Sequence, residues 1–308
     1  MNIDKSSLES IVREVVEKSL SGGGGAGGGS PASSVPPNGQ AIGPICDLPN
    51  AGALKEKLAR DEPTYGIWVT IDAPVVTEMA ARMGVDWVVI DAEHGYLDMR
   101  NVMEHIRVAN LANVPILVRI AEIQEGLIKR IMDIGADGIV VPQVRTANEL
   151  ATAVRWTKYP PEGKRGIGAE RATRWGMGIE QCVPRANKNS MVVSMMETVE
   201  AGEAIEELMN VPGVDAFFFG GHDYSASAGF PGTASEPPVV EKLDSIQRTI
   251  RERRMPSGIV TFDTKQIPQR LDQGFRMIGI GFDTTLLIRA LSDALADAGR
   301  PVQESMWW

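Results

Sequence analysis

The sequence predicts a (β/α)8 barrel over residues 41–308, and three features of that segment point to it. Short runs of β-branched and aromatic residues alternate with stretches of helical periodicity, as in successive strand–helix units around a parallel sheet. Eight such runs are present, and eight parallel strands can close a barrel without leaving a free edge. The segment is also close in length to the roughly 250 residues of a typical barrel. The alternative is an open, doubly wound sheet.

A glycine-rich phosphate loop after a strand would favour the open sheet. The stretch Gly163-Lys-Arg-Gly-Ile-Gly168 has glycines at comparable spacing, but it follows Pro160-Pro161 rather than a strand. We therefore prefer the barrel.

The expected strands are short runs rich in β-branched and aromatic residues, and the expected helices show apolar residues at a repeat of 3.6 residues. The strands are expected at Tyr65–Ile71, Trp87–Asp91, Ile116–Arg119, Gly138–Val141, Met191–Met196, Ala216–Phe219, Ser257–Thr261 and Met277–Gly281. Helices are expected at Met99–Ala112, Gly126–Ile134, Asn148–Lys158, Glu200–Met209, Glu241–Arg253, Lys265–Gln273 and Thr284–Ala298. The segment from Pro160 to Asn189 is long for a barrel connection and is expected to be a lid or binding loop.

Two short segments precede the barrel. Residues 1–20 are expected to form an amphipathic helix, because their apolar positions recur at helical spacing, namely Leu8, Ile11, Val12, Val15 and Val16. Residues 21–40 are rich in glycine, serine and proline and have almost nothing to bury, which is typical of a flexible linker. The helix is therefore expected to lie outside the barrel core.

Composition excludes several classes of partner. The 308 residues carry a net charge of -9 and a pI near 5.0, whereas nucleic acids and anionic membranes select basic surfaces. No apolar stretch approaches the roughly 18 residues that cross a bilayer, so a soluble, cytoplasmic protein is expected. The two cysteines, Cys46 and Cys182, are too few for a disulfide framework, which fits a reducing compartment.

Two carboxylates follow expected strands directly. Glu197 comes after Met191–Met196, and Asp223 comes after the run that begins at Ala216. Enzymes with parallel strands place their chemistry at the carboxyl ends of those strands. Two oxygen ligands from different strands can hold a divalent ion and leave positions open for substrate.

The ends of two other strands also carry ionisable residues. Asp91, Glu93 and His94 lie within four positions, where His94 is a candidate general base and Asp91 a candidate partner that fixes its tautomer. The alternative is a capped turn with a surface histidine. Arg119 ends the third strand and could clamp a carboxylate or stabilise a developing enolate oxygen, or it could bridge two loops. Asp133 lies near the end of a helix, and its position alone predicts a solvated or capping residue.

Several motifs, in order, resemble those of the HpcH/HpaI aldolase family over roughly residues 50–298. They are Trp87-Val-Val-Ile-Asp-Ala-Glu-His94, Leu117-Val-Arg119, Gly138-Ile-Val-Val-Pro142, Tyr159-Pro-Pro-Glu-Gly-Lys-Arg-Gly166, Met196-Glu-Thr198 and Gly281-Phe-Asp-Thr-Thr-Leu-Leu287. The resemblance implies a metal-dependent class II aldolase, which cleaves or forms 4-hydroxy-2-keto acids through a pyruvate enolate. Pyruvate and an aldehyde would then be its small-molecule partners.

The resemblance also implies roles for individual residues. Glu197 and Asp223 would bind a Mg²⁺, Mn²⁺ or Co²⁺ ion that pyruvate chelates, and Arg119 would neutralise the enolate oxygen. His94 would move a proton with the support of Asp91 or Asp133. The substrate would further be contacted by Trp68, near the entrance, and by the backbone of Gly221 and His222.

This chain departs from the resemblance at two places. Met195 stands where similar aldolases usually have glutamine, and Gly220-Gly-His-Asp-Tyr224 stands where they have Gly-Pro-Ala-Asp-Leu. The reaction class tolerates these changes more readily than a particular aldehyde does. The aldehyde, the preferred metal and the physiological direction stay open.

Other readings and partners stay open as well. The alternatives are a malyl-CoA or citramalyl-CoA type of lyase and a non-catalytic barrel bound to a shell. Family members suggest a hexamer of dimers that exchange the last helix, here Thr284–Ala298. Residues 1–20 resemble encapsulation peptides of bacterial microcompartment cargo, which implies a shell protein as partner and a location inside the compartment. Trp307 and Trp308 have no assigned role.

Overall fold

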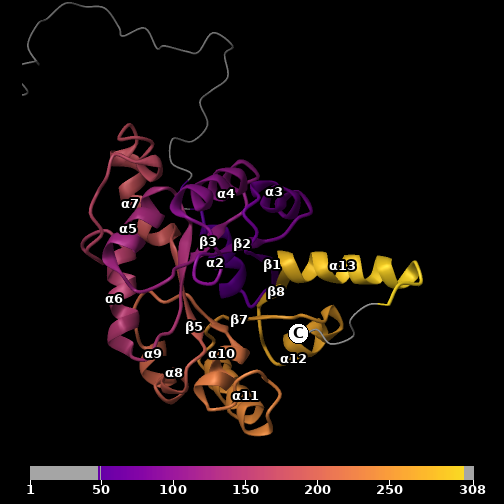
Figure 1. The fold of residues 1–308 in the computed structure, drawn as a ribbon. Helices are drawn as coiled ribbons and strands as arrows, with labels where there is room; N and C mark the ends of the chain where they lie inside the picture. Colours follow the sequence, from indigo (N-terminus) through magenta and orange to yellow (C-terminus); the bar gives the residue numbers. More distant parts are fainter. Residues whose placement is uncertain (1–47, 49, 302–308) are drawn as a thin grey trace, which may run out of the picture. The chain divides into compact units, whose positions relative to one another are not determined.

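A computed structural model describes residue 48 and residues 50–301. In this part of the chain, eight parallel strands form a closed barrel in sequence order, and β1 pairs with both β2 and β8 (Figure 1). The predicted barrel is therefore confirmed. The helix and linker expected within residues 1–40, and Trp307 and Trp308, lie outside the described residues.

The strands run close to their predicted bounds. They are β1 (Thr64–Val69), β2 (Trp87–Asp91), β3 (Ile116–Arg119), β4 (Gly138–Val141), β5 (Met191–Met196), β6 (Ala216–Phe219), β7 (Ser257–Val260) and β8 (Met277–Phe282). The helices are α2 (Gly52–Ala59), α3 (Pro74–Arg82), α4 (Met99–Leu111), α5 (Glu125–Asp133), α6 (Ala147–Thr157), α7 (Ile179–Asn189), α8 (Val199–Glu203), α9 (Ile205–Met209), α10 (Gly221–Ser227), α11 (Pro237–Glu252), α12 (Ile267–Asp272) and α13 (Asp283–Asp297). Short 3-10 turns lie at Arg171–Thr173 and Thr264–Gln266.

The structure differs from the sequence-based expectation mainly in the segments that connect the strands. The segment from Pro160 to Asn189 was expected to be a loop, but its last 11 residues form α7. The single helix expected at Glu200–Met209 is divided into α8 and α9 at Ala204. Helices α2 and α3 were not predicted, and the residues after β6 form the first turn of α10 rather than an open loop.

Alternation along each strand decides which side chains fill the barrel. The interior cluster includes Trp87 and Val89 of β2, Leu117 of β3 and Met195 of β5. Gly66 of β1 has no side chain because a Cβ there would lie 2.1 Å from the Trp87 ring. Since side chains alternate between the two faces of a strand, the inward rows continue at the carboxyl ends to Asp91, Arg119 and Glu197.

Helix α2 packs at the amino ends of the strands. The Ala51 N–H donates to the Asn189 carbonyl at 3.0 Å, and Lys55 Nζ lies 2.8 Å from Asp215 Oδ1. The buried side chains of Leu54 and Leu58 belong to the interior cluster. This packing covers the amino ends, and polar side chains gather in a cavity at the carboxyl ends.

Helix α13 extends away from β8 in Figure 1 and carries exposed aliphatic side chains. Leu287, Ile288, Leu291 and Leu295 are each at least 40% exposed. They form an apolar surface of the kind that the expected helix exchange between subunits would bury. The exchange stays a prediction.

Within residues 50–301, no helix is both long and apolar enough to cross a membrane.

Candidate active site

A cavity of about 520 Å³ opens at the carboxyl ends of the strands. Its polar lining includes Asp91, His94, Arg119 and Asp223. The rest is largely apolar, with Trp68, Met195, Phe218, Val240, Leu243, Ile259, Val260, Phe262, Phe275 and Phe282 among the lining residues. The cavity therefore joins a charged region to a chamber suited to an apolar group.

Arg119 and Asp91 form a buried pair at the charged end. They are register partners on β3 and β2, which places their side chains side by side. Arg119 Nε and Nη2 donate to the two Asp91 carboxylate oxygens at 2.9 and 2.5 Å. Asp91 Oδ1 also accepts from the backbone N–H groups of Glu93 and His94. A guanidinium has five N–H donors, so this fork leaves donors for a ligand.

Glu93 is a second acidic partner of Arg119, and the sequence analysis gave it no role of its own. Its Oε2 lies 3.1 Å from Arg119 Nη1, but no hydrogen bond forms and the oxygen is buried. Burial raises the pKa of Glu93 to about 7; the Arg119 charge opposes this rise, while Asp91 and Asp223 add to it. Its place two residues after inward-facing Asp91 is the sequence signal that could have identified it.

Glu197 follows β5 and is 1% exposed. Its Oε1 accepts from Gln143, at 2.6 Å from the backbone N–H and 3.3 Å from Nε2. Its Oε2 is buried and has no hydrogen-bond partner. Burial raises the pKa of Glu197 to about 7; the Gln143 hydrogen bond and Arg119 lower it, and Glu93 and Asp223 raise it.

Gly220 leaves the space beside this carboxylate. A Cβ at Gly220 would lie 2.9 Å from Glu197 Oε2 and 3.2 Å from Met195 Cε. Glycine at this position therefore leaves the unpaired oxygen unobstructed. Gln143 was not predicted at the site, because a residue in a strand–helix loop gives no sequence signal for such a contact.

Asp223 lies in the first turn of α10 and is partly exposed. Its charge acts on both Glu93 and Glu197, which places the three carboxylates in one electrostatic cluster. Within the described residues, no three acidic, histidine or cysteine side chains are arranged to hold a metal ion. Glu197 and Asp223 carry hard oxygen donors of the kind that a divalent cation binds.

His94 lies at the mouth of the cavity. Its side chain is 61% exposed, and its Nε2 is 3.9 Å from Glu93 Oε2. The sequence analysis expected Asp91 or Asp133 beside this ring. In the structure Asp91 contacts the His94 backbone, and Glu93 is the carboxylate that faces the imidazole.

Asp133 is not brought to this cavity within one chain. It ends α5, and a helix that returns to the start of the next strand ends at the amino side of the barrel. Its Oδ1 instead accepts from Arg165 Nη2 at 2.7 Å. Arg165 is buried and lies over the Tyr159 ring at 4.4 Å. These contacts are those of a structural pair.

The three expected substrate contacts besides Arg119 all line the cavity. Trp68 is 1% exposed and lies on the inner wall rather than near the entrance, with the Arg119 guanidinium 4.9 Å from its ring centroid. Gly221 and His222 belong to the first turn of α10 and line the cavity.

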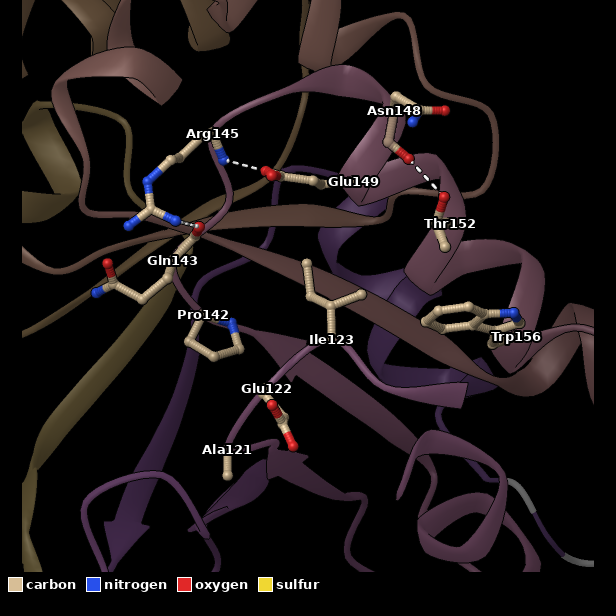
Figure 2. Close-up of a pocket in the computed structure, with 10 residues that line it drawn as sticks. All are labelled: Ala121, Glu122, Ile123, Pro142, Gln143, Arg145, Asn148, Glu149, Thr152 and Trp156. Carbon is tan, nitrogen blue, oxygen red and sulfur yellow. Dashed lines mark hydrogen bonds between the residues drawn. The ribbon is translucent and has the colours of Figure 1, made fainter. Parts of the chain in front are cut away.

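A second cavity of about 420 Å³ lies beside the loops after β3 and β4 (Figure 2). Its lining includes Gln143, Arg145, Asn148, Glu149 and Trp156. Gln143 thus lines this cavity and bonds to Glu197, which is buried beside Gly220 of the larger cavity.

This chain is similar to known proteins over most of its length. Residues 64–290 match the family model described as HpcH/HpaI aldolase/citrate lyase. A 2-keto-3-deoxy-L-rhamnonate aldolase of Escherichia coli O17:K52:H18 is 34% identical over 246 residues, which are 79% of this chain and 91% of the relative. An HpcH/HpaI aldolase/citrate lyase family protein from Burkholderia cenocepacia J2315 is 31% identical with a TM-score of 0.77, over 80% of this chain and 99% of that one. The citrate synthase SbnG is 28% identical with a TM-score of 0.72, over 80% and 97%.

Proposed function

The chain belongs to the HpcH/HpaI aldolase/citrate lyase family, and on that basis we propose that it is a metal-dependent class II pyruvate aldolase. It would cleave or form 4-hydroxy-2-keto acids, with pyruvate on one side of the reaction and an aldehyde on the other. The aldolase name of the 34% identical relative supports this reaction class.

The observation that carries the proposal is the state of Glu197. A carboxylate oxygen that is buried without a hydrogen-bond donor costs free energy unless a cation or proton compensates it. The pKa of Glu197 is raised to about 7 for the same reason, because burial disfavours its charged form and too little positive charge lies nearby to offset this. Glu197 and Asp223 supply hard oxygen donors, so these residues fit a Mg²⁺, Mn²⁺ or Co²⁺ ion. When bound, such an ion supplies Lewis-acid polarisation of a keto group.

Arg119 would bind and stabilise negative charge on pyruvate. Asp91 and Trp68 hold the guanidinium in place, so its free N–H donors are already oriented before substrate arrives. The pyruvate carboxylate is best placed at the first turn of α10, where the backbone N–H groups of Gly221 and His222 lie at the positive end of a helix dipole.

Glu93 and His94 would handle the proton of the aldol hydroxyl. Glu93 has a pKa of about 7 and is buried beside Arg119, while His94 lies between Glu93 and solvent. A proton can therefore pass from the buried carboxylate region to the exposed imidazole. Asp91 is occupied by Arg119 and two backbone N–H groups, so its role is to position Arg119.

The test is pyruvate release from a panel of 4-hydroxy-2-keto acids that includes 2-keto-3-deoxy sugar acids. We expect EDTA to stop the release and added Mn²⁺ to restore it. Borohydride should trap no adduct between pyruvate and a lysine of the enzyme. The same panel presented as CoA thioesters tests the lyase alternative. Absence of release from every free acid, or a strict need for CoA, would contradict the proposal. A barrel that binds neither metal nor pyruvate would favour the scaffold alternative.

We also propose that residues 1–20 direct the enzyme into a bacterial microcompartment. Their amphipathic pattern and the glycine-rich linker at residues 21–40 support this targeting role. Deletion of residues 1–20 is expected to abolish co-purification with shells while the barrel keeps its activity. Unchanged co-purification of the shortened protein would rule the targeting role out.

A further inference from the structure

Gln143 occupies an unusual backbone conformation next to the acidic cluster. It follows β4 and Pro142, and its φ of 50° lies in the left-handed region that residues other than glycine rarely adopt. In this conformation its backbone N–H reaches Glu197 Oε1 at 2.6 Å, and its side-chain Nε2 reaches the same oxygen at 3.3 Å. Backbone and side chain of one residue thus hold one carboxylate oxygen.

The segment around Gln143 is held from the α6 side. Arg145 Nη1 donates to the Gln143 carbonyl at 3.5 Å, and the Arg145 N–H donates to Glu149 Oε2 at 2.8 Å (Figure 2). Thr146 and Glu149 form a capping box at the start of α6. These contacts tie the segment that follows Gln143 to the start of α6.

The segment is also tied to the strand that carries Glu197. Thr198 Oγ1 donates to the Val144 carbonyl at 2.8 Å. The residues that follow Gln143 and Glu197 in the chain are therefore bonded to each other. This second tie keeps the two loops in register, so that the amide and the carboxylate face each other.

The result is a carboxylate with two unlike oxygens. Oε1 accepts twice from Gln143, while Oε2 is buried without a donor beside Gly220, which lines the cavity. Met195 lies two residues before Glu197, is 3% exposed and has no N–H or O–H in its side chain. The only side-chain amide that the described structure places on Glu197 is that of Gln143.

We infer that Gln143 is a positioning residue that orients Glu197 so that Oε2 is presented to a divalent cation. This inference rests on the proposed metal-dependent function. The amide that supports the Glu197 carboxylate therefore comes from Gln143, in the loop after β4. Met195 of β5 has no side-chain amide and cannot provide it. Partners that orient a metal-binding carboxylate typically change metal affinity or activity about 10- to 100-fold when they are removed.

The test compares Mn²⁺ dissociation constants, measured by electron paramagnetic resonance, for the parent and three variants. Gln143→Met removes the side-chain amide but keeps the backbone N–H, so we expect about tenfold weaker binding, the low end of the usual range. Gln143→Met combined with Met195→Gln returns an amide from β5 and is expected to recover most of the lost affinity. Asn148→Met makes the same chemical change at an exposed position of α6 and should bind like the parent.

Two further readouts separate positioning from folding. The melting temperature of Gln143→Met without metal should match that of Asn148→Met, and its turnover at saturating Mn²⁺ should approach the parent value. Equal Mn²⁺ affinity of Gln143→Met and the parent would overturn the inference, as would a double variant that recovers nothing. A parent that binds no Mn²⁺ would instead refute the proposed function, so the two failures are distinguishable.

Discussion

Replacing Arg119 with methionine will lower the rate of pyruvate C3 proton exchange by about 10²–10³-fold, the usual effect of losing one oriented donor to an oxyanion. Arg119 is the cation that the structure places against Asp91 and Glu93, and it is buried above Trp68. Without it, the negative charge that develops on pyruvate loses the guanidinium donors and stays close to Asp91 and Glu93. Exchange into the methyl group, followed by NMR in deuterated water, measures this step without an aldehyde.

The stability of this variant has to be separated from its activity. Removing one partner of a buried ion pair typically costs about 3–5 kcal/mol, because the other charge stays buried. The double variant Arg119→Met with Asp91→Asn removes both charges and should recover much of the stability but none of the exchange. Arg119→Lys keeps the charge without the bidentate fork and should fall between the parent and Arg119→Met. Parent-like exchange by a folded Arg119→Met protein would remove Arg119 from the mechanism.

Replacing Glu197 with glutamine will weaken Mn²⁺ binding by about 100-fold or more and will lower pyruvate exchange with it. Glutamine keeps the size of the side chain but removes the charge that the buried site holds beside Asp223. Asp223→Asn should have the same direction of effect. Because both changes also relieve carboxylate repulsion, the metal-free variants should melt no lower than the parent.

Glu200→Gln is the matched control for Glu197→Gln. Glu200 lies on α8, three residues further along, and its exposed side chain is 3.9 Å from Arg145. Its replacement should leave both Mn²⁺ affinity and exchange unchanged. If Glu197→Gln also behaved like the parent, Glu197 would not be a metal ligand.

The parts of the fold and site that depend on local pattern could be predicted from the sequence. The short apolar runs of β2 and β3 predicted strand ends at Asp91 and Arg119, and in the structure these two residues are register partners. The position of Glu197 after an apolar run likewise predicted a carboxylate at the mouth of the barrel. These residues could be found because strand direction and side-chain alternation follow directly from sequence.

The partners of these residues depend on tertiary contacts and could not be predicted in the same way. Gln143 reaches Glu197 only because its loop adopts a positive φ and is held by the cap of α6. Glu93 takes the place beside His94 that was expected for Asp91. Asp133 ends α5 and pairs with Arg165, so within one chain it lies apart from the cavity, and a role beside His94 stays a prediction.

The central claim is that this barrel forms a pyruvate enolate in a metal-dependent site. The most direct test is NMR of pyruvate alone in deuterated water with the purified full-length protein, before and after removal of metal by EDTA. The account predicts loss of the methyl proton signal with metal, no loss without it, and recovery on addition of Mn²⁺. Exchange that proceeds unchanged without metal, or no exchange under any condition, would contradict the account.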